Sequence, residues 1–221
     1  MLEIRSIDKK FGDKIVLKNV SLDIPDKNII GIYGPSGIGK STLAKILVGI
    51  IPPDSGQVFL NDEPLYKKKQ YNRKLGKAIQ LVYQETYSPF DDTKTIYDAI
   101  TSILKYYNIA TKSNYYNLIK KAFNKLALDD IVLKQYPKEL SGGEAKRVLI
   151  CMALLLNPKV LILDEATVML DPMTEAQIAN LVKVLKQNMS IIWISHNKKM
   201  LDYVCDDIYC LKEGVLIKYE K

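Results

Sequence analysis

A glycine-rich segment between an apolar run and a helical pattern constrains this chain more than any other feature. Residues 29–33 are apolar in the manner of a strand buried on both faces, and apolar residues recur at helical spacing over 43–50. Between them, residues 34–42 read Gly-Pro-Ser-Gly-Ile-Gly-Lys-Ser-Thr, which fits the phosphate-binding pattern G-x-x-x-x-G-K-[ST]. A chance glycine-rich turn before a helix is the alternative, and the strand and helix on either side disfavour it.

The chemistry of this segment suits a nucleotide. Its glycines allow backbone N–H groups to turn inward around an anion, at the positive end of the following helix. Lys40 would reach the β- and γ-phosphates, and the Ser41 hydroxyl would coordinate Mg²⁺. The residues that we expect to bind ATP here are Gly34, Pro35, Ser36, Gly37, Ile38, Gly39, Lys40, Ser41 and Thr42.

A second apolar run, Val160–Leu163, ends in two carboxylates. Asp164 at the strand end is placed to hold Mg²⁺, and Glu165 to orient and polarise an attacking water. Taken alone, a core strand with an acidic exit is an equal interpretation. Beside the phosphate-binding segment, the functional interpretation is favoured.

The remaining patterns predict the fold. Ser190–Ile194 is a third buried run, whereas Leu2–Ile24 and Gly56–Leu60 are typical of short antiparallel strands. Residues 95–135 show helical spacing. We therefore expect an α/β fold: a P-loop NTPase core with a mostly parallel sheet, an N-terminal antiparallel β subdomain and an α-helical insert. It would be one domain over 1–221, with a core of 1–83 and 148–221 and a helical subdomain of about 84–147.

Residues 140–144, Leu-Ser-Gly-Gly-Glu, precede a long apolar helical pattern. Ser141 and Glu144 fit a capping box. Two glycines in a first helical turn are nevertheless costly if capping is the only purpose. They also suit backbone N–H groups that approach a phosphate closely.

At this point the chain resembles the ABC ATPase family. Residues 140–144 look like its signature motif, which has Gln where this chain has Glu144. The other motifs follow in order over nearly the whole chain: Gln84 matches the Q-loop, Asp171 the D-loop, His196 the switch histidine and Phe11 the aromatic that stacks on adenine. A lone Gln, His or Phe is more often structural, so the resemblance rests on the presence of all the motifs in the expected order.

The resemblance implies a mechanism. Ser141, Gly142, Gly143 and Glu144 of one subunit would contact the ATP of another, so that two subunits close head to tail, with Asp171 at their interface. The implied catalytic set is Glu165 as base, His196 as γ-phosphate contact and Gln84 as water and metal contact. The implied Mg²⁺ ligands are Ser41, Gln84 and Asp164.

Two departures from the family pattern stand out. Glu144 adds a negative charge near a phosphate site unless capping occupies it. Residues 167–171 form an unusual D-loop, where the family prefers small residues. Neither departure removes a catalytic group, so we expect an active ATPase with a slow turnover.

The segment 84–90 looks most like ATPases of the oligopeptide, dipeptide and nickel importers, although 91–93 depart from that class. The end of the chain at Lys221 favours a compact metal- or metallophore-type subunit, or a trimmed chain. The implied partners are a second ABC ATPase subunit, the same or different, transmembrane permease subunits and, indirectly, a substrate-binding protein. A soluble ABC ATPase, such as an iron–sulfur assembly or translation factor, and a DNA-repair ATPase are the alternatives.

Composition is that of a globular protein, with 48% hydrophobic and 26% charged residues. The longest apolar run, Val148–Leu156, is about half of a membrane span, and charges at Glu3, Arg5 and Asp8 interrupt any signal-peptide core. We expect a peripheral protein on the cytoplasmic face of the membrane. The net charge of +7 is scattered, so we expect no nucleic-acid partner.

Overall fold

The computed structural model describes residues 1–68, 70–83, 90–168 and 170–219. Its strands are β1 (Leu2–Phe11), β2 (Lys14–Ile24), β3 (Ile29–Tyr33), β4 (Ser55–Leu60), β5 (Glu63–Pro64), β6 (Tyr66–Lys67), β7 (Gln70–Tyr71), β8 (Ile79–Val82), β9 (Val160–Asp164), β10 (Ser190–Ser195), β11 (Asp207–Lys212) and β12 (Val215–Tyr219). Its helices are α1 (Lys40–Leu47), α2 (Ile96–Tyr106), α3 (Tyr115–Lys125), α4 (Gly142–Leu155), α5 (Pro172–Leu185) and α6 (Lys198–Val204). Short 3₁₀ turns lie at Arg73–Leu75, Lys112–Asn114, Asp130–Lys134 and Pro137–Glu139.

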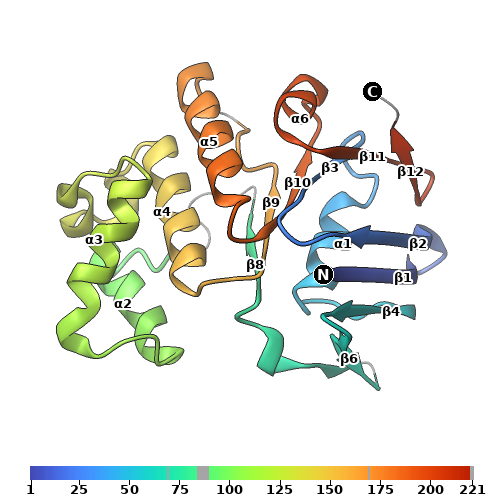
Figure 1. The fold of residues 1–221 in the computed structure, drawn as a ribbon, viewed down its shortest axis with the longest axis horizontal. Coiled ribbons are helices and arrows are strands. Elements are labelled where there is room, and N and C mark those ends of the chain that lie inside the picture. Colours follow the sequence, from blue (N-terminus) through green and yellow to red (C-terminus); the bar gives the residue numbers. More distant parts are fainter. Residues whose placement is uncertain (69, 84–89, 169, 220–221) are drawn as a thin grey trace.

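A six-stranded sheet in the order β12-β11-β3-β10-β9-β8 forms the centre of the molecule (Figure 1). All neighbours pair in parallel except β12, which is antiparallel to β11. Successive side chains of a strand point to opposite faces, and both faces of this sheet are covered. Leu161 therefore joins one hydrophobic core and Ile162 the other. This explains the uninterrupted apolar runs in the sequence.

A second sheet, β2-β1-β4-β5, is antiparallel, as predicted for the N-terminal part. Helix α1 lies between the two sheets (Figure 1). Its Leu43 and Ile46 are fully buried and share a core with Ile4 of β1 and Ile192 of β10. Helix α1 is thus packed against both sheets, and the glycine-rich segment leads directly into this helix.

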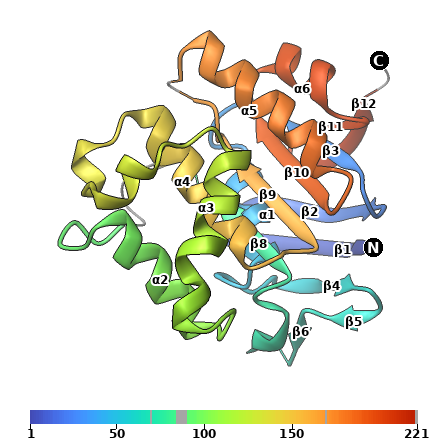
Figure 2. The same ribbon diagram turned by 60° about the vertical axis from the view of Figure 1, so that its left-hand side comes forward.

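The other face of the central sheet is covered by α4, α5 and α6, and the insert α2 and α3 packs on α4 (Figures 1 and 2). Ile100 of α2, Phe123 of α3 and Val148 of α4 are fully buried in the same core as Trp193 of the sheet. The predicted boundary near 147 falls within α4, and the subdomain division stays a prediction. Among the described residues, no helix is long and apolar enough to span a bilayer.

Candidate nucleotide-binding site

The site forms where three neighbouring strands end. β10 lies between β3 and β9, with Ser195 opposite Tyr33 and Ile194 opposite Asp164. Because the strands are parallel, the segments that follow them emerge at one edge of the sheet, which is where α/β folds bind ligands. The glycine-rich segment, Glu165 and His196 therefore meet.

The glycine-rich segment opens the N-terminus of α1 for an anion. Gly39 precedes the helix with φ +118°, and no described side chain caps this end. A Cβ at Gly39 would lie 2.7 Å from Val16 Cγ1, so the position excludes a larger residue. Gly37 also has a left-handed φ, of +76°. The first N–H groups of α1 consequently stay available.

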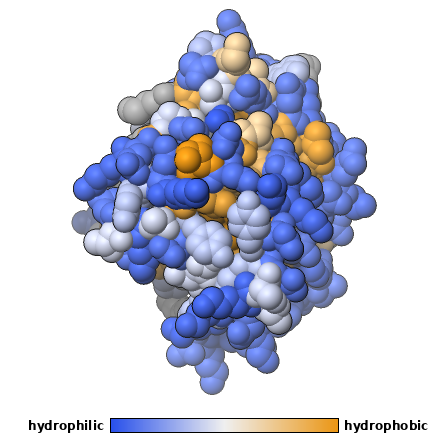
Figure 3. Space-filling view, turned by 90° about the vertical axis from the view of Figure 1, so that its left-hand side faces the viewer, coloured by the Kyte–Doolittle hydropathy of each residue, from blue (hydrophilic) through white to orange (hydrophobic). Residues whose placement is uncertain are grey.

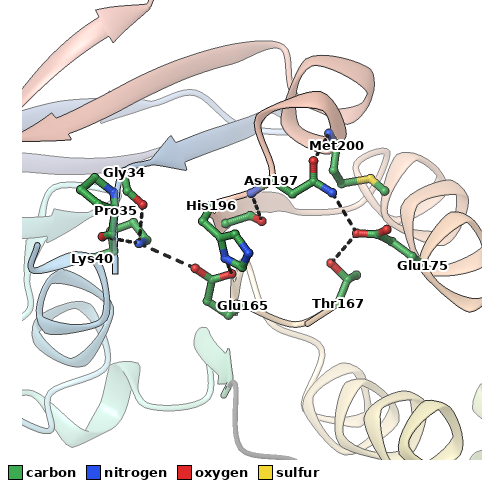
Figure 4. A network of polar contacts seen from close by, with 10 residues as sticks. Gly34, Pro35, Lys40, Glu165, Thr167, Glu175, His196, Asn197 and Met200 are labelled. Atoms are coloured by element: carbon green, nitrogen blue, oxygen red, sulfur yellow. Dashed lines mark hydrogen bonds and ion pairs between the residues drawn. The ribbon is translucent and has the colours of Figure 1, made fainter. Parts of the chain in front are cut away.

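Lys40 begins α1 and is buried, with 5% of its surface exposed. Its Nζ donates to the carbonyls of Gly34 (2.7 Å) and Pro35 (3.0 Å) and lies 3.7 Å from Glu165 Oε1 (Figure 4). A hollow of about 130 Å³ beside it is lined by Ser36, Gly37, Gly39, Lys40, Ser41, Thr42 and Glu165. The predicted phosphate cation and the predicted base thus face the same space.

Glu165 adopts φ +50°, a left-handed conformation that is costly for a residue other than glycine. Its carboxylate is buried, and its Oε2 accepts a hydrogen bond from Nδ1 of His196 at 3.0 Å (Figure 4). An ionised carboxylate only accepts, so with Glu165 ionised this contact requires a proton on Nδ1 of His196. The Nε2 edge of His196, whose side chain is 61% exposed, is left for a ligand.

Asp164 ends β9 and is buried, and its Oδ1 has no hydrogen-bond partner among the described residues. The pKa of Asp164 lies above its usual range, chiefly because of burial and also because of the Glu165 charge, while a hydrogen bond with the Ser41 hydroxyl and the charges of Lys40 and Lys45 offset part of the rise. An orphaned carboxylate oxygen beside a hydroxyl is a hard donor set that fits Mg²⁺. Gln84, the third predicted ligand, lies outside the described residues.

The predicted signature segment stands apart from this hollow. Among the described residues, none of 140–144 lines it, and in Figure 1 α4 lies on the opposite side of β8 and β9 from α1. Ser141 and Gly142 are exposed. A Cβ at Gly143 would lie 3.0 Å from Thr174 of α5, which gives this glycine a packing reason that the sequence did not reveal.

Glu144 forms the capping box with Ser141. Its Oε2 accepts from the Ser141 backbone N–H (2.9 Å) and hydroxyl (2.6 Å), and its own N–H donates to the Ser141 oxygen at 3.3 Å. The hydrogen bond from the Ser141 hydroxyl, followed by that from the backbone N–H, holds the pKa of Glu144 below its usual range. Capping therefore occupies this carboxylate.

Asp171 caps α5, accepting from the backbone N–H groups of Met173 and Thr174, each at 3.0 Å. Hydrogen bonds from Thr174, first from its hydroxyl, lower the pKa of Asp171. Phe11 is half exposed at the end of β1, with Lys9 Nζ 5.4 Å from its ring centre. Its predicted adenine contact and the dimer contact of Asp171 stay predictions.

Sequence reasoning missed two features near the site. Lys146 in α4 is fully buried, donates to the carbonyl of Tyr83 at 2.6 Å, and has its pKa lowered by burial to about 8. Its spacing to the buried Ile150 was an available signal, since residues four apart share a helix face. The second feature is a hydrogen-bond network on Glu175 that connects residues far apart in sequence.

Comparisons with known proteins show the family of the chain. The family model described as "ABC transporter" matches residues 17–168. The nickel import ATP-binding protein NikE of Escherichia coli (strain K12) is 32% identical over 212 residues, covering 95% of this chain and 79% of that protein. The phosphate import ATP-binding protein PstB of Saccharolobus solfataricus is 35% identical over 215 residues, covering 94% and 83%.

Solved structures show the same fold. CbiO1 of Clostridium perfringens, part of the transporter complex CbiONQ, has a TM-score of 0.85 at 28% identity, covering 98% of this chain and 86% of that one. The ATP-binding cassette MJ0796, in a dimeric post-hydrolysis state with ADP and Pi, also has a TM-score of 0.85, at 25% identity, covering 100% and 98%. This chain belongs to the ABC transporter family, and it is an ABC ATPase.

Proposed function

We propose that this chain is the ATP-hydrolysing subunit of an importer of peptides, nickel or metal chelates, acting peripherally on the cytoplasmic face of the membrane. The observation that carries the ATPase role is that Lys40 and Glu165 line one hollow and that Glu165 contacts His196. The importer role is supported by relatives named for nickel and phosphate import, each aligned over at least 94% of the chain.

The residues divide the chemistry between them. The open N-terminus of α1 and Lys40 bind the phosphates of ATP, and His196 contacts the γ-phosphate. Glu165 takes a proton from the attacking water while the oxygen of that water bonds to the γ-phosphorus. The bond from that phosphorus to the bridging oxygen breaks, leaving ADP and phosphate. Asp164 and Ser41 would hold Mg²⁺, which when bound neutralises phosphate charge.

A second subunit completes each site in this proposal. Ser141 and Gly142 are exposed and remote from the hollow of their own chain, which suits contact with the nucleotide of another. Two chains that close head to tail would enclose two ATP molecules. Hydrolysis would remove the γ-phosphate that bridges them, so the pair would open.

The membrane partner would bind the surface around Gln84 and residues 86–107. The face of the insert in Figure 3 carries hydrophobic groups among hydrophilic ones. A hollow of about 640 Å³ on the insert joins the start of α2 to the 3₁₀ turn at Asp130–Lys134. Its lining mixes apolar and charged side chains: Thr95, Tyr97, Tyr116, Asp129, Asp130, Ile131, Leu133 and Lys134.

A charge reversal on α2 tests the transport role. Lys105 is exposed and forms no ion pair among the described residues, so Lys105→Glu should leave the subunit folded and hydrolysing ATP. We expect it to weaken co-purification with a multi-span membrane subunit. Lys212→Glu, on β11 at the other end of the molecule, is the matched control. Absence of any multi-span partner with the wild-type chain favours a soluble, iron–sulfur-assembly-type ATPase.

A further inference from the structure

The chain segments that follow Glu165 and His196 are joined by a single carboxylate oxygen of α5. Glu175 Oε1 accepts a hydrogen bond from the Thr167 hydroxyl at 3.1 Å and another from Asn197 Nδ2 at 3.4 Å (Figure 4). Thr167 lies two residues after Glu165, and Asn197 directly follows His196. Glu175 lies on helix α5, 8 residues from Thr167 and 22 residues from Asn197 in the sequence.

Both partners of Glu175 are otherwise constrained. The Thr167 residue is 6% exposed, so its hydroxyl has little access to water as an alternative partner. Asn197 donates its backbone N–H to Ser195 Oγ (3.0 Å) and accepts from the Met200 N–H (3.3 Å), which makes it the cap of α6. A displacement of either residue is therefore transmitted to the neighbouring Glu165 or His196.

The Glu165 conformation needs such support. A non-glycine residue with φ near +50° is retained only where surrounding contacts hold it. On one side the contacts are the Glu165 N–H to the carbonyl of Ile194 (3.0 Å) and the carboxylate to His196. On the other side, Thr167 and its bond to Glu175 hold the chain that leaves the site.

We propose that Glu175 is a positioning residue, which sets the Glu165–His196 pair by holding Thr167 and Asn197 on one oxygen. The inference rests on the proposed function, because that function gives Glu165 and His196 their roles. Glu175 lies one helical turn after Asp171, the cap of α5 and the predicted interface residue. Contact with a second subunit at Asp171 would thereby reach the catalytic pair through α5.

The single histidine of this chain makes the proposal measurable without relying on turnover. Its imidazole gives a single Hε1 resonance and a single Hδ2 resonance in NMR. The Hε1 resonance is sensitive to the Glu165 contact, and Glu165→Gln defines the change when that contact is altered. The test variants are Glu175→Ala, Glu175→Met and Glu175→Gln. Gln177→Ala, on an exposed position of α5, controls for changes in the helix, and thermal melting confirms folding.

We expect Glu175→Ala and Glu175→Met to move the His196 Hε1 resonance towards its position in Glu165→Gln. Their kcat should fall about ten- to a hundred-fold, since small misplacements of reacting groups are costly, while binding of a fluorescent ATP analogue is retained. Glu175→Gln should match the wild type because its amide oxygen accepts both hydrogen bonds. Gln177→Ala should match it too.

A wild-type resonance or a wild-type kcat in a folded Glu175→Ala or Glu175→Met protein overturns the proposal. So does a Glu175→Gln variant as impaired as Glu175→Ala, because charge and not hydrogen bonding would then be responsible. Failure of the proposed function is distinct: Glu165→Gln would then hydrolyse ATP at the wild-type rate whatever Glu175 does.

Discussion

Two helices of this protein begin in glycine-rich sequence, and their N-termini are opposites. At α1 the residue before the helix is Gly39, no described side chain caps it, and Lys40 adds a buried cation. At α4 the preceding residue is Ser141, and the carboxylate of Glu144 closes the helix end. The N-terminus of α1 is open to an anion, whereas the N-terminus of α4 already holds the carboxylate of Glu144.

The two helix ends have different electrostatic properties. Helix N-termini favour negative charge, and no described side chain occupies the N-terminus of α1, so a phosphate can bind there. At α4 the preference is partly satisfied within the chain. A phosphate from a second subunit would approach Glu144 as a like charge. We therefore expect the α1 end to bind nucleotide within one chain, and the Glu144 charge to oppose closure of the pair.

Removing the cation from the open end should impair nucleotide binding, on which every later step depends. In Lys40→Ala the charge-assisted phosphate contact disappears, and so do the hydrogen bonds from Nζ to the carbonyls of Gly34 and Pro35. We expect ATP affinity to fall by at least about a hundred-fold, or about 3 kcal/mol. Titration with a fluorescent ATP analogue measures it. Wild-type affinity would refute the phosphate-loop assignment.

Removing the base should affect turnover and spare binding. Glu165→Gln keeps the size of the side chain but loses the carboxylate that polarises water. General-base contributions are about 10²–10⁴-fold, so steady-state hydrolysis should drop by that factor. ATP affinity should persist, because Lys40 and the α1 N-terminus are intact. Normal hydrolysis in this variant would exclude Glu165 as the base.

Neutralising the closed end should strengthen association. Glu144→Gln retains an oxygen that can cap α4 and removes the charge that opposes a phosphate. In a Glu165→Gln background, we expect the ATP-dependent dimer to tighten about fivefold, equivalent to about 1 kcal/mol. Analytical ultracentrifugation with and without Mg-ATP measures this. Unchanged or weaker dimerisation would show that the Glu144 charge does not oppose closure.

The smallest effect concerns stability and pH. Hydrogen bonds from Ser141 lower the pKa of Glu144 in the folded state. Ionised Glu144 therefore stabilises the fold fully above its unfolded pKa of 4.5, and this contribution is lost as pH falls through the lower, folded value. The group is largely solvated, so the gain over Glu144→Gln should be only a few tenths of a kcal/mol. Urea unfolding at pH 7 and at pH 4 and below measures it, and a gap that widens on acidification would contradict the sign.

Sequence reasoning predicted the parts of the fold that depend on local pattern. The three buried runs became β3, β9 and β10, since strands covered on both faces are apolar throughout. The capping box at Ser141 formed as expected. Strand order was not predictable, and it is strand order that places His196 against Glu165.

The remaining features depend on tertiary contacts between distant residues. The left-handed conformation of Glu165 has no local signal, because glycine would ordinarily adopt it. A Cβ atom at Gly143 would crowd Thr174, which lies on another helix. Glu175 accepts hydrogen bonds from Thr167, which precedes it in the sequence, and from Asn197, which follows it. These relations appear only once the helices are packed.

The most direct test of the ATP-driven pair is the association state of Glu165→Gln. With ATP bound and not cleaved, the γ-phosphate should keep bridging the Lys40 site of one chain and the Ser141 end of another. Size-exclusion chromatography with light scattering should therefore show a monomer without nucleotide and a dimer with Mg-ATP, and no dimer when Lys40→Ala is added. A hydrolysis-deficient variant that binds Mg-ATP yet stays monomeric, even when its natural partner chain is supplied, would contradict the head-to-tail mechanism.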